Sequence, residues 1–395
     1  MARKVVEKNI SYDNGKKRFY VNMDYGKDES GKRIKKTKTY LTKSEAKTAL
    51  KEFEANKTKG LLVFPKKTTL KEWLDYWMDN IVKPNRQPTT YQFYKSMIDK
   101  YTSPLLGSTP IQDLKPMQIQ KYYTQLKNKN KLSPNTIRKH HDMLHLALGT
   151  AAKQEQILQN PVDKVEPPQK QHKEARFYNL EELKALFLLV KNTDLEITVQ
   201  LAAGLGLRRE EICGLRWDHV DLENRKIRIC EARTIAGTEI IAKDTKNQSS
   251  NRTLTISADI VELLLKEKAK QEKNKKYLGD LYEDSGYIVV RDDGKPYRPN
   301  YLSGKFKKLI DDNGLPPLTI HGLRHTFASV ANSQGITLFE IGKVLGHSTP
   351  STTGKIYTHL FDNTHEATLE KVAEAENLDK KEGASQTLCK LRMRV

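Results

Sequence analysis

The chain is poor in cysteine and contains no long apolar run, and both absences narrow its possible classes. The three cysteines, Cys213, Cys230 and Cys389, are too few and too scattered for a disulfide framework or a zinc quartet. No stretch approaches about 18 consecutive apolar residues, so we expect no transmembrane helix. The basic start is followed by no apolar segment, so we expect no signal peptide and a reducing cytoplasm as the compartment.

Acidic residues are also in short supply relative to basic ones. The 395 residues include 69 Lys and Arg against 49 Asp and Glu, which gives a net charge of +20. Residues 1–60 hold 17 basic and 8 acidic side chains, so this surplus is dense near the start. A basic surplus of this size is typical of proteins that bind a polyanion, and nucleic acid is the usual one.

The pattern of apolar residues divides the chain into three blocks and a tail. We expect domains at 1–62, 63–165 and 177–379, an exposed polar linker at 166–176 and a charged tail at 380–395. The expected fold class is multidomain and mainly α. It combines a small sheet plus one helix, an all-helical domain, and a mixed domain that is mostly helical with a small sheet between Lys226 and Ile256.

The first block predicts a β-hairpin followed by a helix. Lys17–Asp24 alternates as a strand does, Arg33–Tyr40 forms a second strand, and Thr42 begins the helix. Five basic residues gather on one arm of the hairpin: Lys32, Arg33, Lys35, Lys36 and Lys38. Lysines guard exposed edge strands in many sheets. A basic β-ribbon can also lie in a DNA groove, and we favour this second interpretation.

The second block predicts four helices with apolar stripes. They begin at Leu70 after a Thr69 cap, at Pro88, at Leu114 and after Ser133-Pro134, where serine caps and proline takes the first helical position. The tryptophan and leucine stripes form the core. Three basic residues of the last helix are candidates for contacts with DNA phosphates: Arg138, Lys139 and His140.

Six residues of the third block form a set that suits phosphodiester chemistry: Arg208, Lys246, His321, Arg324, His347 and Tyr357. Two arginine forks match the non-bridging phosphate oxygens and can replace the metal ions of many nucleases. A tyrosine can attack phosphorus and keep the phosphate as a covalent ester. A histidine can take the phenol proton, and a lysine can protonate the departing sugar oxygen. Each residue alone is ordinary, but the ordered combination favours strand transfer.

Local spacing supports two members of this set. His321 and Arg324 are three residues apart, so they share one face if Gly322–Asn332 is helical. Leu323, Phe327 and Val330 recur at helical spacing in this segment. His321 then lies at the helix start, where free backbone N–H groups and the helix dipole favour a phosphate.

These motifs resemble those of the tyrosine recombinases, the phage integrase family, and specifically the integrases of temperate phages and conjugative transposons. Residues 202–222 are similar to the first arginine box, in which Arg208 matches the catalytic arginine and Glu211 the acidic residue that follows it. Arg209 adjoins Arg208, but the Gly-Leu-Arg order favours Arg208. The His-x-x-Arg box, the second histidine and the nucleophile are matched by residues 321–328, His347 and Tyr357.

The resemblance leaves the catalytic lysine open between two positions. The family carries it in a β-hairpin of variable length, and the corresponding run here spans residues 243–253. Counting back from Arg252-Thr253 favours Lys246, and Lys243 remains the alternative.

The resemblance implies a site-specific recombinase that cuts and rejoins DNA through a 3′-phosphotyrosyl link, with type IB topoisomerase-like chemistry. It implies no cofactor and no metal, and an arm-binding, a core-binding and a catalytic domain. Its partners are then double-stranded DNA at arm and core sites, three further protomers in a tetramer, an excisionase and a host DNA-bending protein.

The alternatives are a non-catalytic DNA-binding regulator on a recombinase scaffold, an Xer-like resolvase and a metal-dependent nuclease. Phage and transposon origins are not distinguished.

Overall fold

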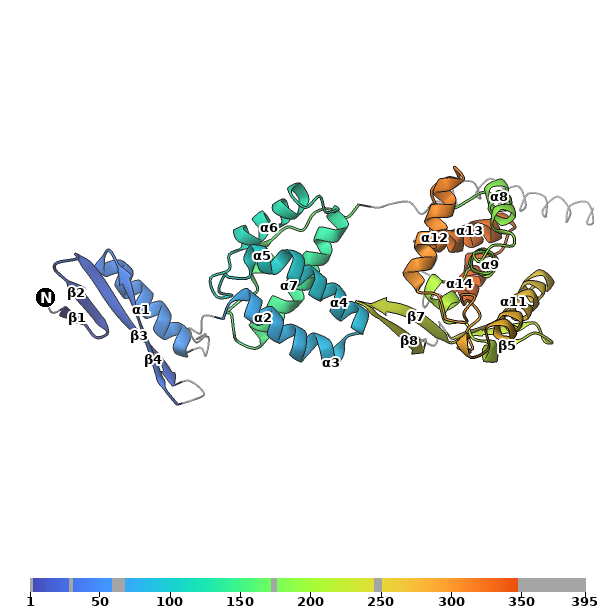
Figure 1. Cartoon of the computed structure of the whole chain (residues 1–395). Helices are drawn as coiled ribbons and strands as arrows, with labels where there is room; N and C mark the ends of the chain where they lie inside the picture. Colours follow the sequence, from blue (N-terminus) through green and yellow to red (C-terminus); the bar gives the residue numbers. More distant parts are fainter. Residues whose placement is uncertain (1–2, 28–30, 59–67, 172–175, 245–250, 347–395) are drawn as a thin grey trace, which may run out of the picture. The chain divides into compact units, whose positions relative to one another are not determined.

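The computed structural model describes residues 3–27, 31–58, 68–171, 176–244 and 251–346. The chain divides into two compact units, Met1–His172 and Lys173–Val395 (Figure 1). A small sheet with one helix and an all-helical body make up the first unit. The second is mostly helical with short strands, so the expected mainly α, multidomain fold class is confirmed. The exact domain boundaries remain predictions.

The first unit begins with an antiparallel sheet in the order β1-β2-β3-β4. The strands and the helix that covers them are β1 (Lys4–Glu7), β2 (Ile10–Asp13), β3 (Arg18–Lys27), β4 (Arg33–Tyr40) and α1 (Lys43–Thr58). Apolar side chains of the sheet, among them Val21 and Met23, pack against Ala46 and Phe53 of α1. The hairpin and helix were predicted, whereas β1 and β2 were not, because four-residue strands are too short for a periodic pattern.

The helical body of the first unit contains every helix that the sequence predicted. Its elements are α2 (Leu70–Trp77), η1 (Met78–Val82), α3 (Lys83–Asn85), α4 (Pro88–Met97), η2 (Ile98–Thr102), α5 (Ser103–Leu106), α6 (Pro116–Asn128), α7 (Pro134–Lys153) and η3 (Pro161–Lys164). Thr69 caps α2 with a reciprocal bond to Glu72, and Ser133 caps α7. The predicted tryptophan and leucine stripes, including Trp73, Trp77 and Leu144, are buried in its core.

Two short π-helices interrupt this body and were not predicted. Each lies directly before a three- or four-residue α-helix whose second residue is proline, Pro84 after η1 and Pro104 after η2. Proline has no N–H to donate to the carbonyl four residues earlier, and its ring clashes with that carbonyl. The wider π turn accommodates the ring without ending the helix.

One expectation for α7 is wrong. His140 was expected to be exposed, but it is fully buried. Its Nδ1 lies 2.8 Å from Tyr122 Oη. The same phenol lies 2.9 Å from Thr102 Oγ1. Burial lowers the pKa of His140 to about 4, so the imidazole is neutral at neutral pH. It is part of a buried polar chain, so its ring is not on the surface where a DNA phosphate could reach it.

Apart from a small cluster of Ala328, Ala331, Ile341 and Leu345, the second unit packs around one large apolar core. Its elements are α8 (Leu180–Val190), α9 (Glu196–Gly204), α10 (Arg209–Cys213), η4 (Trp217–His219), β5 (Val220–Asp221), β6 (Lys226–Ile229), β7 (Glu231–Ala236), β8 (Glu239–Asp244), β9 (Arg252–Thr255), α11 (Ala258–Leu278), η5 (Gly279–Leu281), α12 (Pro299–Asp312), α13 (Ile320–Ser333) and α14 (Leu338–Leu345). Cys213 is buried in this core, as expected, and burial raises the pKa of its thiol to about 12.

The single small sheet expected between Lys226 and Ile256 is in fact two sheets. Strands β5, β6 and β9 form one antiparallel sheet, and β7 pairs with β8 in a separate two-stranded ribbon. The chain leaves the first sheet after Ile229 and returns to it at Arg252, which pairs with Ile229. The ribbon is therefore an excursion between two neighbouring strands, and Arg252 is where the chain rejoins the sheet.

Candidate active site

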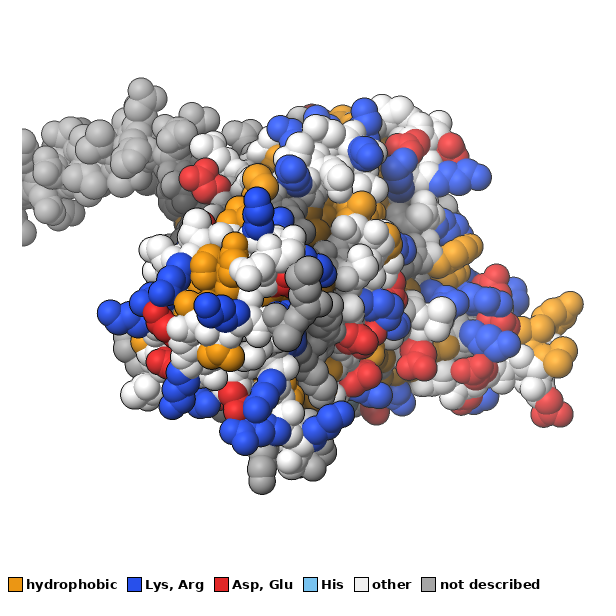
Figure 2. All heavy atoms as spheres, turned by 90° about the vertical axis from the view of Figure 1, so that its left-hand side faces the viewer, with side chains coloured by type: hydrophobic (Ala, Val, Ile, Leu, Met, Phe, Trp, Pro, Cys, Tyr) orange, Lys and Arg blue, Asp and Glu red, His pale blue; other side chains and the backbone are white. Residues whose placement is uncertain are grey.

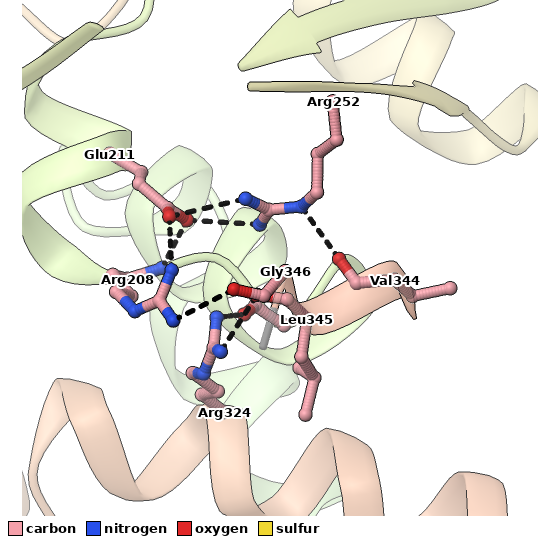
Figure 3. Close-up of polar contacts among 8 residues, drawn as sticks. Arg208, Glu211, Arg252, Arg324, Val344, Leu345 and Gly346 are labelled. Carbon is pink, nitrogen blue, oxygen red and sulfur yellow. Dashed lines mark hydrogen bonds and ion pairs between the residues drawn. The ribbon is translucent and has the colours of Figure 1, made fainter. Parts of the chain in front are cut away.

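The Arg208 segment is shaped by a glycine and a glutamate. Gly206 has a φ of +62°, and a Cβ there would lie 2.5 Å from a methyl carbon of Leu345, so only glycine fits this turn. Arg208 then caps α10, where its backbone N–H donates to Glu211 Oε2 over 3.0 Å. Its Nη1 donates to Glu211 Oε1 over 2.6 Å and its Nη2 to the Gly346 carbonyl over 3.3 Å. The guanidinium is held from both sides (Figure 3).

Arg324 is the largest fully buried side chain described. Its Nη1 donates to the Gly206 carbonyl and its Nη2 to the Leu345 carbonyl, each over 2.8 Å. Gly206 lies two residues before Arg208, and Leu345 lies two residues before His347. The two predicted arginines therefore meet at the turn that follows α14, and both are bonded to consecutive carbonyls, of Leu345 and Gly346 (Figure 3).

His321 lies in the first turn of α13, as the spacing predicted, and Thr319 caps this helix. Partial desolvation lowers the pKa of His321, and the positive charges of Arg324 and Arg208 lower it further. A neutral imidazole at neutral pH can accept a proton. His321 and His325 stack edge to face with ring centroids 4.9 Å apart. His321 also borders a surface cavity of about 770 Å³.

Arg209, the alternative to Arg208, has different partners. Its guanidinium bonds Glu210, Asn300 and Ser303. It also lines the cavity beside His321. Arg208 is the arginine that joins Glu211 and the turn after α14.

Three of the six predicted residues, Lys246, His347 and Tyr357, lie outside the described residues. The described chain stops beside them: β8 ends at Asp244, β9 begins at Arg252, and α14 is followed by Gly346. Lys243, the alternative lysine, is in β8 and pairs with Ala232 through the backbone. Of the six predicted residues, the described part of the chain contains Arg208, His321 and Arg324, and the structure brings these three together.

Sequence reasoning missed Arg252 as part of this cluster. Its Nη1 and Nη2 donate to both oxygens of Glu211 over 3.2 and 3.0 Å, and its Nε donates to the Val344 carbonyl over 2.7 Å. In the sequence, Arg252-Thr253 served only to locate the catalytic lysine by counting back from it. No sequence pattern pointed to it, because the burial of Glu211, whose charge then needs compensation, is decided by the tertiary structure.

The basic residues of β4 do not form one surface. Lys38 lies opposite Val21, on the face that α1 covers, whereas Lys35 lies opposite Asp24 on the other face. Arg33 forms an ion pair with Asp24 over 2.6 Å. Lys36 pairs with Met23, so it shares the face of Lys38, and Lys32 precedes the strand. A DNA contact by all five at once would require more than one face of the sheet.

The two candidates on α7 also differ in their surroundings. Arg138 is half-buried and its Nη1 donates to the Pro168 carbonyl over 3.0 Å. Lys139 is exposed and its ammonium lies 5.2 Å from the centre of the Phe93 ring. In the view of Figure 2, Lys and Arg side chains are spread over the surface with Asp and Glu among them, and no single basic patch dominates.

Comparison with known proteins decides the family. Residues 177–364 match the phage integrase family, residues 69–127 its N-terminal SAM-like domain, and residues 9–57 an arm DNA-binding domain. The chain belongs to the phage integrase family of site-specific tyrosine recombinases.

Curated relatives of this recombinase carry matching names. A tyrosine recombinase XerC-like protein of Caldanaerobacter subterraneus is 29% identical over 370 residues, which cover 88% of this chain and 94% of the relative. The ICEBs1 integrase of Bacillus subtilis is 26% identical over 288 residues, 72% of this chain and 78% of the relative.

Solved structures share the fold of the recombinase. The Tn1549 transposon integrase in complex with a circular intermediate DNA has a TM-score of 0.66 at 19% identity, and the match covers 77% of this chain and 99% of that one. A lambda integrase tetramer bound to a Holliday junction has a TM-score of 0.56 at 18% identity over 90% of this chain and 96% of that one. Among the described residues, no helix is long and apolar enough to cross a membrane.

Proposed function

We propose that this recombinase integrates and excises a mobile element and that Arg208, Lys246, His321, Arg324, His347 and Tyr357 perform the strand transfer. The observation that carries the proposal is the convergence of Arg208 and Arg324 on the carbonyls of Leu345 and Gly346, directly before His347. Two guanidiniums fixed side by side provide preorganised positive charge for a phosphate whose negative charge grows during attack.

The proposed reaction keeps one phosphodiester at every stage. The Tyr357 oxygen forms a bond to phosphorus while the bond from phosphorus to the 5′-oxygen breaks, in line with the attack. His321 accepts the phenol proton, and its lowered pKa favours the neutral form that this role requires. Lys246 gives a proton to the departing 5′-oxygen. A 5′-hydroxyl of the partner strand then attacks the 3′-phosphotyrosyl link and releases Tyr357.

We propose that the larger assembly is a tetramer on two duplexes, since two strand exchanges through a four-way junction need four active sites. The lambda integrase, which has the same fold, forms a tetramer on a Holliday junction. The proposed partners include arm and core DNA sites, an excisionase and a host DNA-bending protein. The proposed place of action is the host cytoplasm, at the nucleoid. Lys32, Arg33, Lys35, Lys36, Lys38, Arg138 and Lys139 remain the proposed DNA contacts.

A dimer resolvase is the second candidate, because one relative is named XerC-like. The match of residues 9–57 to an arm DNA-binding domain favours an integrase, since resolvases of that type usually lack such a domain. The two differ in their substrates: an integrase requires arm sites, and a resolvase does not.

Covalent trapping in a chelator tests the chemistry. The substrate is a nicked duplex made from the ends of the element that encodes the chain, and Tyr357→Phe is the control. We expect a denaturant-resistant protein–DNA adduct with the native chain and none with the variant. An adduct with Tyr357→Phe, or a strict requirement for a divalent metal, contradicts the proposal.

A further inference from the structure

The buried ion pair between Arg252 and Glu211 poses an electrostatic question that the proposed chemistry does not answer. Glu211 is 3% exposed and Arg252 is 8% exposed, whereas Arg208 is 31% exposed. All three guanidinium nitrogens of Arg252 donate to Glu211 or to the Val344 carbonyl, so the group is directed at the carboxylate. Arg208 shares the same carboxylate (Figure 3) and is the most exposed of the three side chains.

A count of charge shows what Arg252 does for Arg208. Glu211 alone would neutralise Arg208, since their side chains are bonded over 2.6 Å, and the pair would present no net charge to a phosphate. With Arg252 bonded to both carboxylate oxygens, the three groups together carry one positive charge. That charge lies where the trio is exposed, at Arg208.

The protonation state of Glu211 agrees with this arrangement. Burial raises the pKa of Glu211, but the hydrogen bonds and charge of Arg252, followed by the charge of Arg208, outweigh burial and leave the pKa below its usual value. The carboxylate is therefore ionised at neutral pH, and its charge must be balanced by a partner other than Arg208 if Arg208 is to bind phosphate.

Arg252 also follows one segment with a candidate catalytic residue in the sequence, and it is hydrogen-bonded to the helix that precedes another. It is the first residue of β9, immediately after residues 245–250, which include Lys246, and its Nε bonds the carbonyl of Val344 in α14. Val344 is three residues before His347. One guanidinium thus connects the arginine box to the end of α14.

We propose that Arg252 is a positioning residue that neutralises Glu211 and so keeps the charge of Arg208 available to the scissile phosphate. The inference rests on the proposed strand transfer at Tyr357. Arg252 does not contact the phosphate itself; it acts through Glu211 and Arg208. The proposal differs from a purely structural clamp because it depends on charge, and charge can be removed from Glu211 as well as from Arg252.

The test is a double-mutant cycle with Arg252→Gln, Glu211→Gln and both together. Each purified full chain is assayed for affinity by gel shift and for the single-turnover rate of adduct formation on the nicked duplex. We expect Arg252→Gln to slow adduct formation roughly 100-fold, the size of effect seen when one electrostatic donor is lost. We expect DNA affinity to stay within about threefold, because the phosphate backbone contacts that dominate affinity are unchanged.

The double variant distinguishes charge from structure. With Glu211→Gln there is no carboxylate to trap Arg208, so the double variant should form adduct roughly tenfold faster than Arg252→Gln alone, a recovery expected of directly coupled residues. Arg252→Lys, which keeps the charge but loses the fork, should lie within about tenfold of the native chain. A double variant no faster than Arg252→Gln, or Arg252→Lys as slow as Arg252→Gln, overturns the proposal.

Arg233 provides the matched control for folding. It is also a buried arginine of the strand region, 6% exposed, and it bonds the carbonyls of Cys213 and Tyr297 and lies over the Tyr287 ring. None of these partners is a candidate catalytic group. Arg233→Gln should lower thermal stability as Arg252→Gln does but leave the rate of adduct formation within about threefold per folded molecule. Equal losses of rate in both variants contradict the proposal.

Failure of the proposed function looks different from failure of this inference. If Tyr357→Phe still forms the adduct, the assignment of the nucleophile is wrong, whatever the Arg252 variants do. If the adduct depends on Tyr357 and Arg252→Gln reacts at the native rate, the strand-transfer proposal stands and the positioning role of Arg252 is refuted.

Discussion

The catalytic unit and the helical body of the first unit both bury polar side chains, but they do so in opposite ways. Around Arg208 the buried groups are charged: Glu211 and Arg252 hold each other, and Arg324 is held by backbone carbonyls. In the helical body the buried chain Thr102–Tyr122–His140 is neutral.

The two networks differ in the free energy that their desolvation costs. A buried charge costs several kcal/mol to desolvate unless it is paired, and an apolar replacement is often at least as stable. A neutral hydrogen-bonded chain avoids that cost and contributes about 1 kcal/mol per bond. The charged cluster is therefore explained better by the phosphate chemistry that we propose than by stability, and the neutral chain is explained by packing alone.

The largest expected effect is the loss of activity in Arg324→Lys. An ammonium cannot replace a fork that donates to two carbonyls at once, so the charge should move away from the phosphate. We expect adduct formation to slow by about 100- to 1,000-fold with little change in DNA affinity. The single-turnover rate and a gel shift measure the two quantities. A variant that loses affinity and rate in parallel would place Arg324 in binding and not in catalysis.

An acid transition should come next in size, and it should begin below about pH 6.5. The pKa of His140 is lowered from 6.5 to about 4 when the chain folds. Between these values the unfolded chain binds a proton that the folded chain does not, so stability falls as pH falls from 6.5 toward 4. The full window corresponds to about 3 kcal/mol.

Tryptophan fluorescence can follow this transition, because Trp73 and Trp77 lie in the same core as His140 and Trp217→Phe removes the signal of the other unit. Urea unfolding at pH 7 and pH 5 gives the loss of stability. In His140→Phe that loss should shrink. His145→Phe is the matched control, since His145 is exposed and paired with Asp163. An unchanged loss in His140→Phe would assign the acid sensitivity to other groups.

The smallest expected effect is that of Tyr122→Phe, and it sharpens the contrast between neutral and charged networks. Removal of the phenol oxygen leaves Thr102 and His140 each without one partner, so we expect a loss of about 1–3 kcal/mol in urea unfolding at neutral pH. Thr102→Val in the same chain should recover little of that loss, because the Thr102 hydroxyl keeps its bond to the Met97 carbonyl when the phenol oxygen is removed. A large recovery would show that the hydroxyl of Thr102 depends on Tyr122 alone.

Local sequence patterns predicted much of the fold and pointed to Arg208, His321 and Arg324, but not to Arg252. The caps at Thr69 and Ser133, the apolar stripes, the burial of Cys213 and the shared face of His321 and Arg324 all depend on residues within a few positions of one another. Periodicity and capping report such neighbours well. The same patterns failed for the short strands β1 and β2 and for the π-helices.

Tertiary structure decided the rest, because those contacts join residues far apart in the chain. The Gly206 carbonyl meets Arg324 across 118 positions and Glu211 meets Arg252 across 41, distances over which no periodic pattern extends. Likewise, α7 places a histidine at position 140, but only packing against Tyr122 decides that it is buried and neutral. The sequence by itself determined which chemistry was available, and the fold decided which groups hold one another's charge.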